Sequence, residues 1–470
     1  MKWNETLPQL LSGATTCENT VKQFLQRAEI NKHLNAFLEL YPDEALQRAK
    51  TLDEKRLSGK PIGKLHGMVI ALKDNICYAN HRVSASSKIL EGYVSPYSST
   101  VVERLLAEDA IIIGRTNCDE FAMGSSNENS AFGNVLNDAD NTRVPGGSSG
   151  GSAVAVQSGM CHAALGTDTG GSIRQPAALT GTIGLKPTYG RISRYGIIAY
   201  ASSLDQVGTF TNSVEDAALL IEVMCGKDER DSTTSKKEVE NFSALKQNGK
   251  MKIAYIKDVL EHEGLQKDIR ERTFWLIEKL KTDGHTVNAI EFPFLDYLIP
   301  TYYVIANAEA SSNLARYDGM RYGYRSPNAK SLEEVYVKSR SEGFGKEVKN
   351  RIMMGTFVLS AGYYDAYYTK AMKVRRVLQN KVNEILQQYD FVLCPTSPTE
   401  AFEIGAKSKD PVAMYLSDIY TVLANLAGNP AISLPLFKSE KNLPVGIQLM
   451  SENFSEEKLL AFSKHLLEFK

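Results

Sequence analysis

The sequence predicts an α/β protein, because helical patterns and short apolar runs follow one another along the chain. A helical pattern over 101–106, behind the capping residues Ser98 and Ser99, is followed at once by the apolar run 110–114. A second apolar run, 67–72, leads into a polar segment. Such alternation is typical of layered α/β architecture. The chain has 470 residues, of which 43% are hydrophobic, so it can bury a large core.

The other elements follow from the same signals, taken in chain order. Helices are expected within 16–57, where Pro42 opens one helix and Gly59 closes it. Ser213 begins a capped helix, and the charged stretch 226–250 is expected to be a solvated surface excursion. The remaining expected elements are helix 214–224, helices after each of two glycine-rich loops, strand 252–256, helix 267–281, strand 285–290, tyrosine-rich helices around 302–303, 315–325 and 363–368, strand 391–396, a buried loop and strand over 429–435, and a closing helix over 459–469.

Composition argues against several classes of function. The formal net charge of −1 gives no general nucleic-acid footprint, although an RNA-linked role through partner subunits stays open. The six cysteines are scattered without a C-x-x-C pair, which fits a reducing cytoplasm and argues against zinc. No apolar run approaches the ~20 residues of a membrane span, and the N-terminal stretch lacks the apolar core of a signal peptide. We therefore expect a cytoplasmic protein without a membrane partner.

The most informative stretch, 143–190, contains two glycine-flanked serine sites, GGSSGG at 146–151 and TGGS at 169–172. Glycine inside a helix or strand costs roughly 0.5–1 kcal/mol relative to alanine. Two glycine clusters around hydroxyls therefore indicate backbone that is bent for close approach to a ligand. Linkers and phosphate cradles also use glycine-rich loops, so composition alone leaves a catalytic role open.

A serine nucleophile needs a base, which is usually a histidine. His162 lies in this stretch, but its apolar neighbours favour a core position. Lys73 follows the run 67–72; with an ordinary pKa of ~10.4, only about 1 lysine in 2,500 is neutral at pH 7, and burial can raise that fraction. The alternative is a lysine that snorkels at a strand end. Ser148 also fits the nucleophile-elbow pattern G-x-S-x-G, although 142–145 is a poor strand that ends in proline.

Lys73, Ser148 and Ser172 stand in the motifs LHGMVIALKDN, GGSSGGS and GTDTGGSIRQPAA, which together resemble the amidase signature family. The segments GLKPTYGRISRYG and SSLDQVG continue the resemblance. It implies an α/β/α sandwich around a central mixed β-sheet. It also implies one unit over 1–470, with a signature region at about 60–210 and a substrate-recognition part at about 250–470.

The resemblance implies a Ser–cisSer–Lys mechanism. Ser172 would attack an amide carbonyl, Ser148, preceded by a cis peptide from Gly147, would relay the proton, and neutral Lys73 would be the base. Donors placed where negative charge develops stabilise the transition state of such a reaction. This oxyanion hole would consist of the backbone N–H groups of Thr169, Gly170, Gly171 and Ser172.

The C-terminal half resembles the tRNA-dependent amidotransferase branch of this family, through EASSNLARYDGMRYGYR and RIMMGTFVLSAGYYDAYYTKAMKVR. This implies a carbon–nitrogen ligase that uses glutamine as amido donor and hydrolyses it at Ser172. In the implied heterotrimer, ammonia would pass to the B subunit, which activates Glu-tRNA(Gln) with ATP and Mg²⁺, and a small C subunit would clamp the other two. Asp-tRNA(Asn) is an alternative substrate. This chain itself is expected to bind no cofactor and no metal.

The same resemblance assigns glutamine-binding residues. Arg351 would hold the α-carboxylate and Asp418 the α-amino group, which suits their charges, and one of Tyr302 and Tyr303 would lie at the pocket. From the residues alone, Arg351 could equally form a surface salt bridge. The segment 119–125 would line the active site, where Glu120 is a helix-capping, metal-binding or catalytic acid.

Several alternatives stay open. The arginine-interleaved tyrosines could stack on RNA bases or pack an interface through their rings. A stand-alone amidase has the same triad, and an assembly subunit that has lost catalysis would share the fold. An α/β-hydrolase would need a catalytic histidine. Cys77 and Cys118 are expected to be buried structural thiols.

Overall fold

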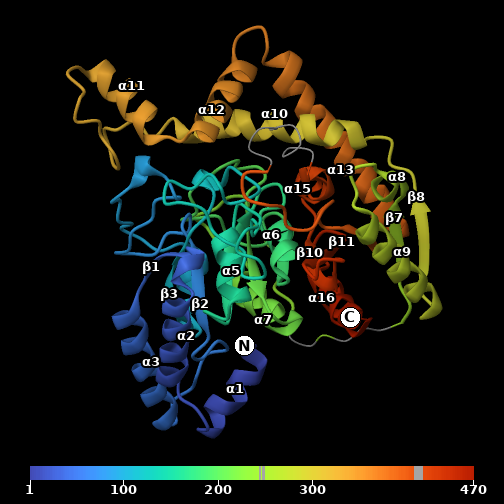
Figure 1. Ribbon diagram of the computed structural model, residues 1–470, viewed down its shortest axis with the longest axis horizontal. Helices are drawn as coiled ribbons and strands as arrows, with labels where there is room; N and C mark the ends of the chain where they lie inside the picture. The colour runs from blue at the N-terminus through green and yellow to red at the C-terminus, as the bar shows by residue number, and fades with distance from the viewer. Residues whose placement is uncertain (243–244, 246–248, 407–416, 470) are drawn as a thin grey trace.

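A computed structural model gives the structure of residues 1–242, 245, 249–406 and 417–469 (Figure 1). A mixed β-sheet forms its centre. Among the described residues this sheet has eleven strands in the order β1-β3-β2-β4-β6-β5-β10-β11-β9-β7-β8. In that order, the strands are Phe37–Leu40, Ile111–Thr116, Val69–Lys73, Ala163–Asp168, Gln206–Thr211, Ile183–Lys186, Ala431–Lys438, Pro444–Ser451, Phe391–Pro395, Lys252–Ile256 and Thr286–Ile290.

The middle of the sheet brings its two sequence halves together. β2 lies between β3 and β4 and runs parallel to both, so the carboxyl ends of these strands share one edge. β2 and β4 are buried along their whole length, as expected of strands covered on both faces. β5 pairs antiparallel with β10, which joins the six N-terminal strands to the five later ones.

Helices pack around the sheet, with α5 against β2 and β4, α6 against β5, β10 and β11, and α7 against β6. Figure 1 shows α10, α12 and α13 crossing one end of the molecule. The helices are α1 Trp3–Ser12, α2 Cys17–Ile30, α3 Pro42–Leu57, α4 Thr100–Ala107, α5 Gly150–Gln157, α6 Arg174–Thr180, α7 Val214–Met224, α8 Lys257–Glu261, α9 Lys267–Thr282, α10 Leu295–Leu314, α11 Leu332–Gly343, α12 Lys346–Leu359, α13 Lys370–Gln388, α15 Val422–Ala427 and α16 Glu456–Leu466. Short helical turns are η1 Lys32–Leu34, η2 Lys88–Leu90, η3 Glu120–Ala122, η4 Asp365–Thr369, η5 Ser417–Tyr420 and η6 Leu467–Phe469.

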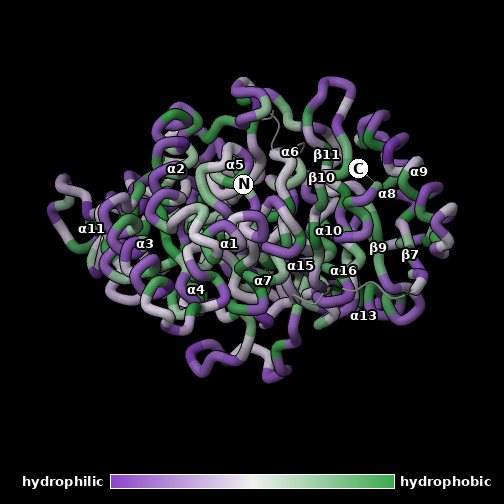
Figure 2. The backbone as a smooth tube through the Cα atoms, turned by 90° about the horizontal axis from the view of Figure 1, so that it is seen from below, coloured by the Kyte–Doolittle hydropathy of each residue, from purple (hydrophilic) through white to green (hydrophobic). Residues whose placement is uncertain are grey.

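A continuous apolar cluster runs through the molecule, from Trp3 in α1 to Leu466 in α16. Figure 2 shows hydrophobic segments in the interior and hydrophilic ones along the outer loops and helices. In the described part of the chain, no helix combines the length and apolarity needed to cross a bilayer.

Most expected elements are present, and two kinds of error stand out. The helix α7 and its Ser213 cap are confirmed, with the Asp216 amide donating to Ser213 Oγ at 3.1 Å. The helix expected over 315–325 is wrong: α10 ends at Leu314, and Gly319 and Gly323 then adopt φ of 75° and 80°, which glycine permits and a helix does not. The sequence reasoning also missed α1 and five strands, β1, β4, β5, β6 and β11. Within the excursion 226–250, residues 243–244 and 246–248 lie outside the described residues.

Candidate active site

The candidate site lies where β2 and β4 end. Lys73 is the last residue of β2, and Thr167 is the penultimate residue of the parallel neighbour β4. Since parallel strands end at a common edge, the two side chains meet, and Lys73 Nζ donates to Thr167 Oγ1 at 3.1 Å. Ser148 enters this site just before α5, and Ser172 lies between β4 and α6.

Three hydroxyls surround the buried Lys73 amine. Nζ lies 2.7 Å from Ser148 Oγ and 2.9 Å from Ser149 Oγ, in addition to Thr167. Ser149 donates its own hydrogen to the Thr167 carbonyl at 3.2 Å. Among the described residues, the Ser148 hydroxyl has no recorded partner other than Lys73. When the lysine is neutral, Ser148 is therefore a hydroxyl that can donate its proton to the amine.

The environment makes the neutral form of this lysine more common than it is for a lysine in water. Burial removes the ammonium from water and lowers the pKa of Lys73 to about 8. The negative charges of Asp119, Asp205 and Asp168 oppose the shift without cancelling it. At pH 7 roughly one molecule in ten then carries a neutral Lys73, against about one in 2,500 for an ordinary lysine. A lysine that snorkels into solvent is inconsistent with this complete burial.

Asp168 shapes the second glycine loop. Its carboxylate accepts the amides of Gly171 at 2.8 Å and Ile173 at 3.3 Å. It also forms a buried, two-pronged ion pair with Arg174, at 3.0 Å for each prong. Burial opposes ionisation, but the charge and hydrogen bond of Arg174, together with the Lys186 charge and the hydrogen bond from Asn425, outweigh it and lower the pKa of Asp168 to about 2. The Gly171 amide, one of the four expected oxyanion donors, is therefore already hydrogen-bonded. Among the described residues, no acceptor is recorded for the other three, the amides of Thr169, Gly170 and Ser172.

The glycines stand where backbone and neighbours approach too closely for a side chain. A Cβ at Gly147 would collide with the Asp119 carboxylate, and one at Gly170 with the Tyr302 hydroxyl. The peptide from Gly147 to Ser148 is cis, as the resemblance implied. Close packing therefore constrains both serine loops.

A narrow pocket opens at Ser172, a residue that is only 8% exposed. The structure brings Ser172, Tyr302, Arg351 and Asp418 together in its lining. The other lining residues are Ala122, Gly124, Ser125, Gly147, Gly170, Gly171 and Gln175.

Asp418 is held at the pocket wall by two hydroxyls. Tyr303 donates to Oδ2 at 2.7 Å and Ser125 donates to Oδ1 at 3.0 Å. Tyr302 lines the pocket, whereas Tyr303 contacts the acid that does. Of the two expected tyrosines, Tyr302 is thus the one placed to touch a bound molecule. The expectation that the segment 119–125 lines the site is confirmed for Ala122, Gly124 and Ser125, although sequence reasoning gave Ser125 no role of its own.

Arg351 is buried, so it does not lie at the surface as the alternative supposed, but it does form a salt bridge within α12, with Glu347. Its Nε donates to Glu347 at 2.7 Å, one turn earlier on α12, and Nη1 donates to the Tyr200 hydroxyl at 2.6 Å. The rings of Tyr200 and Tyr303 lie 5.7 and 5.4 Å from the guanidinium carbon. This arrangement fixes a cation in the same pocket as Ser172 and Asp418. Sequence reasoning also missed Tyr200.

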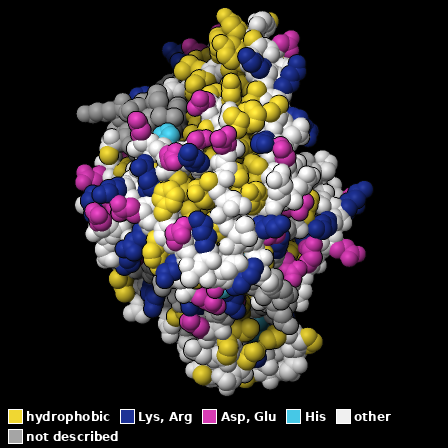
Figure 3. All heavy atoms as spheres, turned by 90° about the vertical axis from the view of Figure 1, so that its right-hand side faces the viewer, with side chains coloured by type: hydrophobic (Ala, Val, Ile, Leu, Met, Phe, Trp, Pro, Cys, Tyr) yellow, Lys and Arg dark blue, Asp and Glu magenta, His cyan; other side chains and the backbone are white. Residues whose placement is uncertain are grey.

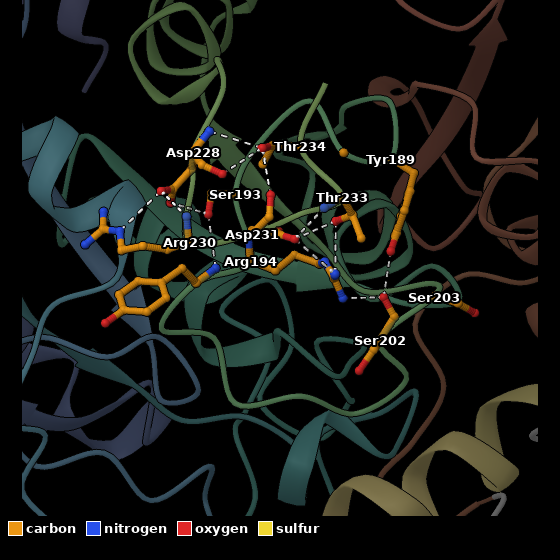
Figure 4. Close-up of polar contacts among 12 residues, drawn as sticks. Tyr189, Ser193, Arg194, Ser202, Ser203, Asp228, Arg230, Asp231, Thr233 and Thr234 are labelled. Atoms are coloured by element: carbon orange, nitrogen blue, oxygen red, sulfur yellow. Dashed lines mark hydrogen bonds and ion pairs between the residues drawn. The ribbon is translucent and has the colours of Figure 1, made fainter. Parts of the chain in front are cut away.

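The loop 200–205 that carries Tyr200 is tied into both the site and the surface. Asp205 accepts the Tyr200 amide at 2.9 Å and the Thr169 hydroxyl at 2.7 Å. The Ser202 carbonyl accepts a hydrogen bond from Tyr189 at 2.8 Å and another from Arg194 (Figure 4). The loop therefore links the second glycine loop to Arg194.

Arg194 in turn holds the charged excursion. Its amide donates to Asp231 Oδ2 at 2.8 Å, and Asp228 accepts from Ser193 at 2.7 Å (Figure 4). Asp228 also accepts the Arg230 amide at 3.0 Å, within a turn closed by Thr234. The described part of 226–250 around these residues is thus anchored to the body, where a merely solvated excursion was expected.

Glu120 caps a helix that is remote in sequence. Its carboxylate accepts the Gly345 amide at 2.8 and 3.1 Å, at the N-terminus of α12, and also the Ser87 hydroxyl. Burial raises the pKa of Glu120 to about 7. The capping alternative fits this geometry, and it connects the segment 119–125 to the helix that carries Arg351.

The histidines do not support a histidine base or a metal ligand set near the site. His162 is buried, its Nδ1 accepts the Val69 amide at 3.0 Å, and burial lowers its pKa to about 3. Far from the site, Asp283, His285 and His465 lie within ligand distance of one another. His285 Nδ1 accepts the Met251 amide at 2.9 Å, and Asp283 lies 3.1 Å from both His285 Nε2 and His465 Nε2. The contact with His465 has hydrogen-bond geometry, whereas His285 Nε2 has no hydrogen-bond partner among the described residues.

The nucleophile-elbow alternative also fails on local structure. The described residues 141–147 before Ser148 contain no strand, and a lysine occupies the position of the base. A serine pair served by a buried lysine is a different arrangement from the histidine-based hydrolase.

Comparison with known proteins agrees with this geometry. The family model described as Amidase matches residues 19–460. The chain therefore belongs to the amidase family.

Three individual proteins show which members of the family this chain resembles. The chain is 52% identical over 458 residues to the A subunit of the glutamyl-tRNA(Gln) amidotransferase of Chlorobium phaeobacteroides, covering 97% of this chain and 96% of the relative. The crystal structure of the A subunit of the glutamyl-tRNA(Gln) amidotransferase from Thermotoga maritima matches with a TM-score of 0.78 and 42% identity, over 95% of this chain and 90% of that one. The peptide amidase from Stenotrophomonas maltophilia matches with a TM-score of 0.82 and 28% identity, over 98% and 95%.

Proposed function

We propose that this chain is the glutamine-hydrolysing subunit of a glutamyl-tRNA(Gln) amidotransferase. The observation that carries the proposal is the shared pocket lining of Ser172, Arg351 and Asp418. A guanidinium and a carboxylate in one narrow pocket match the α-carboxylate and α-ammonium of a free amino acid. The nucleophile beside them would face the side-chain amide. The relatives that are A subunits of such amidotransferases support this reading over nearly the whole chain.

The proposed reaction begins with neutral Lys73. As the Ser172 oxygen attacks the amide carbon of glutamine, its proton moves to the Ser148 oxygen, and the Ser148 proton moves to Lys73 Nζ, 2.7 Å away. The carbonyl oxygen gains negative charge next to the backbone N–H groups of Thr169 and Gly170.

The second half of the reaction returns the protons. The Lys73 ammonium gives a proton back through Ser148 to the departing nitrogen, which leaves as ammonia, while the glutamyl group stays esterified to Ser172. Water then attacks this ester with the same serine–lysine relay as its base, and glutamate departs. One glutamine and one water thus yield one glutamate and one ammonia.

The ammonia is proposed to be used outside this chain. The B subunit would activate the glutamate of Glu-tRNA(Gln), or the aspartate of Asp-tRNA(Asn), with ATP and Mg²⁺, and the C subunit would join the other two in a heterotrimer. This chain is proposed to act in the cytoplasm and to require no cofactor of its own.

A stand-alone amidase is the second candidate, which the likeness to a peptide amidase favours. Such an enzyme has no need for a charged pair that selects an amino acid. The fixed positions of Arg351, between Glu347 and Tyr200, and of Asp418, between Tyr303 and Ser125, therefore favour glutamine as the substrate.

The test is amide hydrolysis by the chain alone and with the two partner subunits, Glu-tRNA(Gln) and ATP. We expect glutamine to be preferred over simple amides and glutamate release to increase in the complex. Equal turnover of simple amides, without any response to partners, would assign the stand-alone amidase instead.

A further inference from the structure

Large apolar side chains, eight in all with Val377, lie exposed on α12, the turn after it and α13. Seven of these, without Val377, are considered together. We call them the aromatic–methionine patch; they are Met353, Met354, Phe357, Tyr363, Tyr364, Tyr367 and Met372. Met353 is 63% exposed and Phe357 47%. The Phe357 ring lies 4.4 Å from that of Tyr363 and 5.8 Å from that of Tyr367, so part of the patch is one contiguous surface. Monomeric proteins rarely leave apolar patches of this kind uncovered.

The patch is built on two helices and the turn and π-turn that join them. After α12, the π-turn η4 continues directly into α13, and Figure 3 shows hydrophobic side chains gathered at this end of the molecule with both basic and acidic ones beside them. α13 is fixed from below by buried Arg375, which donates to the Leu426 carbonyl at 3.0 Å and to the Ser203 carbonyl at 2.9 Å. A surface already held in shape loses little freedom when a partner binds to it.

The exposed charged side chains in the first half of α13, beside the patch, are basic. Lys370, Lys373 and Arg376 are exposed along α13, and none of them has an ion pair recorded among the described residues. Asp365 is the only acid in the sequence between 348 and 383, and its Oδ1 already accepts the Thr369 hydroxyl at 3.0 Å. The chain as a whole has a formal charge of −1, so this basic rim is a local feature that complements an acidic surface.

We propose that the aromatic–methionine patch is the docking surface for a second protein chain, whose contact face is apolar with flanking carboxylates. The proposal rests on the proposed function, which makes this chain one subunit of a complex. A protein fits better than RNA, because the rings of Phe357, Tyr363 and Tyr367 pack against one another instead of presenting open faces for bases. Docking would occur on the helix that carries Arg351, two residues before Met353.

The probe is the pair of B and C subunits from the same genome, purified and titrated against this chain. Phe357→Asp places an unpaired charge in the middle of the patch, and we expect it to weaken binding about 100-fold or more, mainly through faster dissociation. Leu57→Asp on α3 is the matched control, since Leu57 is 74% exposed outside the patch; it should bind as the unaltered chain does.

A second variant tests the rim without touching the apolar centre. Lys373→Glu combined with Arg376→Glu should slow association about tenfold at low salt, and the difference should disappear at about 0.5 M salt, because screening removes long-range attraction. Glutamine hydrolysis by each lone variant should stay within about twofold of the unaltered chain, which shows that folding and the active site are intact.

Normal assembly with both variants would overturn the proposal. So would an intact three-subunit complex whose variants lose only tRNA binding, which would assign the patch to RNA. Loss of self-association by Phe357→Asp, with binding of the partner subunits unchanged, would assign it to a second copy of this chain. If neither the unaltered chain nor any variant hydrolysed glutamine, the result would count against the proposed function. The binding measurements would still test the docking surface.

Discussion

The hydrogen bond from Lys73 to Thr167 gives a direct test of the lysine base. Thr167→Val keeps the shape of the side chain but removes an oxygen that accepts from the ammonium at 3.1 Å. Hydrogen bonds to charged groups contribute ~1.5–3 kcal/mol, and one pKa unit corresponds to about 1.4 kcal/mol. Loss of this acceptor should therefore move the pKa of Lys73 from about 8 towards about 7.

The assay is glutamate release at low glutamine concentration, from about pH 6 to pH 9.5. In the unaltered protein, the neutral fraction of Lys73 rises from roughly 0.1 at pH 7 to roughly 0.9 at pH 9, so kcat/KM should rise about tenfold with a midpoint near pH 8. Thr167→Val should shift this midpoint towards acid by about one unit. Thr209→Val is the control, because Thr209 is also buried but belongs to β6 and has no contact with Lys73 recorded among the described residues.

The lowered pKa of Lys73 also affects the free energy of folding. The folded-state pKa of Lys73 lies below its unfolded value of ~10.4, so burying this residue costs folding free energy, in full below about pH 8 and progressively less up to about pH 10.4. The cost is on the order of 3 kcal/mol. A profile that is flat between pH 7 and 9, or one whose midpoint lies near 10 in the unaltered protein, would refute the lysine as base.

Three further predictions concern the pocket. Ser172→Ala should abolish glutamine-dependent amidation of Glu-tRNA(Gln) by the complex but leave amidation with added ammonia; equal loss of both would contradict its role as nucleophile. Tyr200→Phe removes the hydroxyl 2.6 Å from Arg351 Nη1 and should raise KM for glutamine roughly 10-fold with kcat almost unchanged; a fall in kcat alone would argue against positioning. Asp418→Asn should raise KM for glutamine but not for glutaramate, which lacks the α-amino group, and similar losses for both amides would remove Asp418 as the ammonium partner.

Local signals in the sequence predicted local structure well. Ser213 with its following acids marks the start of α7, and the apolar run that ends at Lys73 marks β2, because caps and buried strands are written in neighbouring residues. β1 was missed because its four residues, Phe37–Leu40, are all half-buried and show no alternation. The pieces of the segment 315–325 were individually compatible with a helix, and only the positive φ of its glycines shows the turn.

The site residues fall into the same two groups, those with a local sequence signal and those without one. The motifs identify Lys73, Ser148 and Ser172, since each stands in a distinctive local context. Tyr200 and Ser125 have no such context, because their importance comes from a hydrogen bond to a residue more than 150 positions away. Nothing in a single sequence states which distant side chain will lie across a pocket.

The pairing of β5 with β10 joins a part of the chain that is synthesised early to one that is synthesised late. All six strands from β1 to β6, together with the lysine and both serines, are complete once the ribosome has passed residue 211. The residues proposed to recognise an amino acid come later, the last of them at position 418. Until then β5 also lacks its neighbour, and an open strand edge invites pairing with other chains. The late part of the chain thus supplies Asp418 for the proposed substrate recognition and, shortly afterwards, β10, which covers the open edge of β5. A chain truncated before this part would lack both Asp418 and β10.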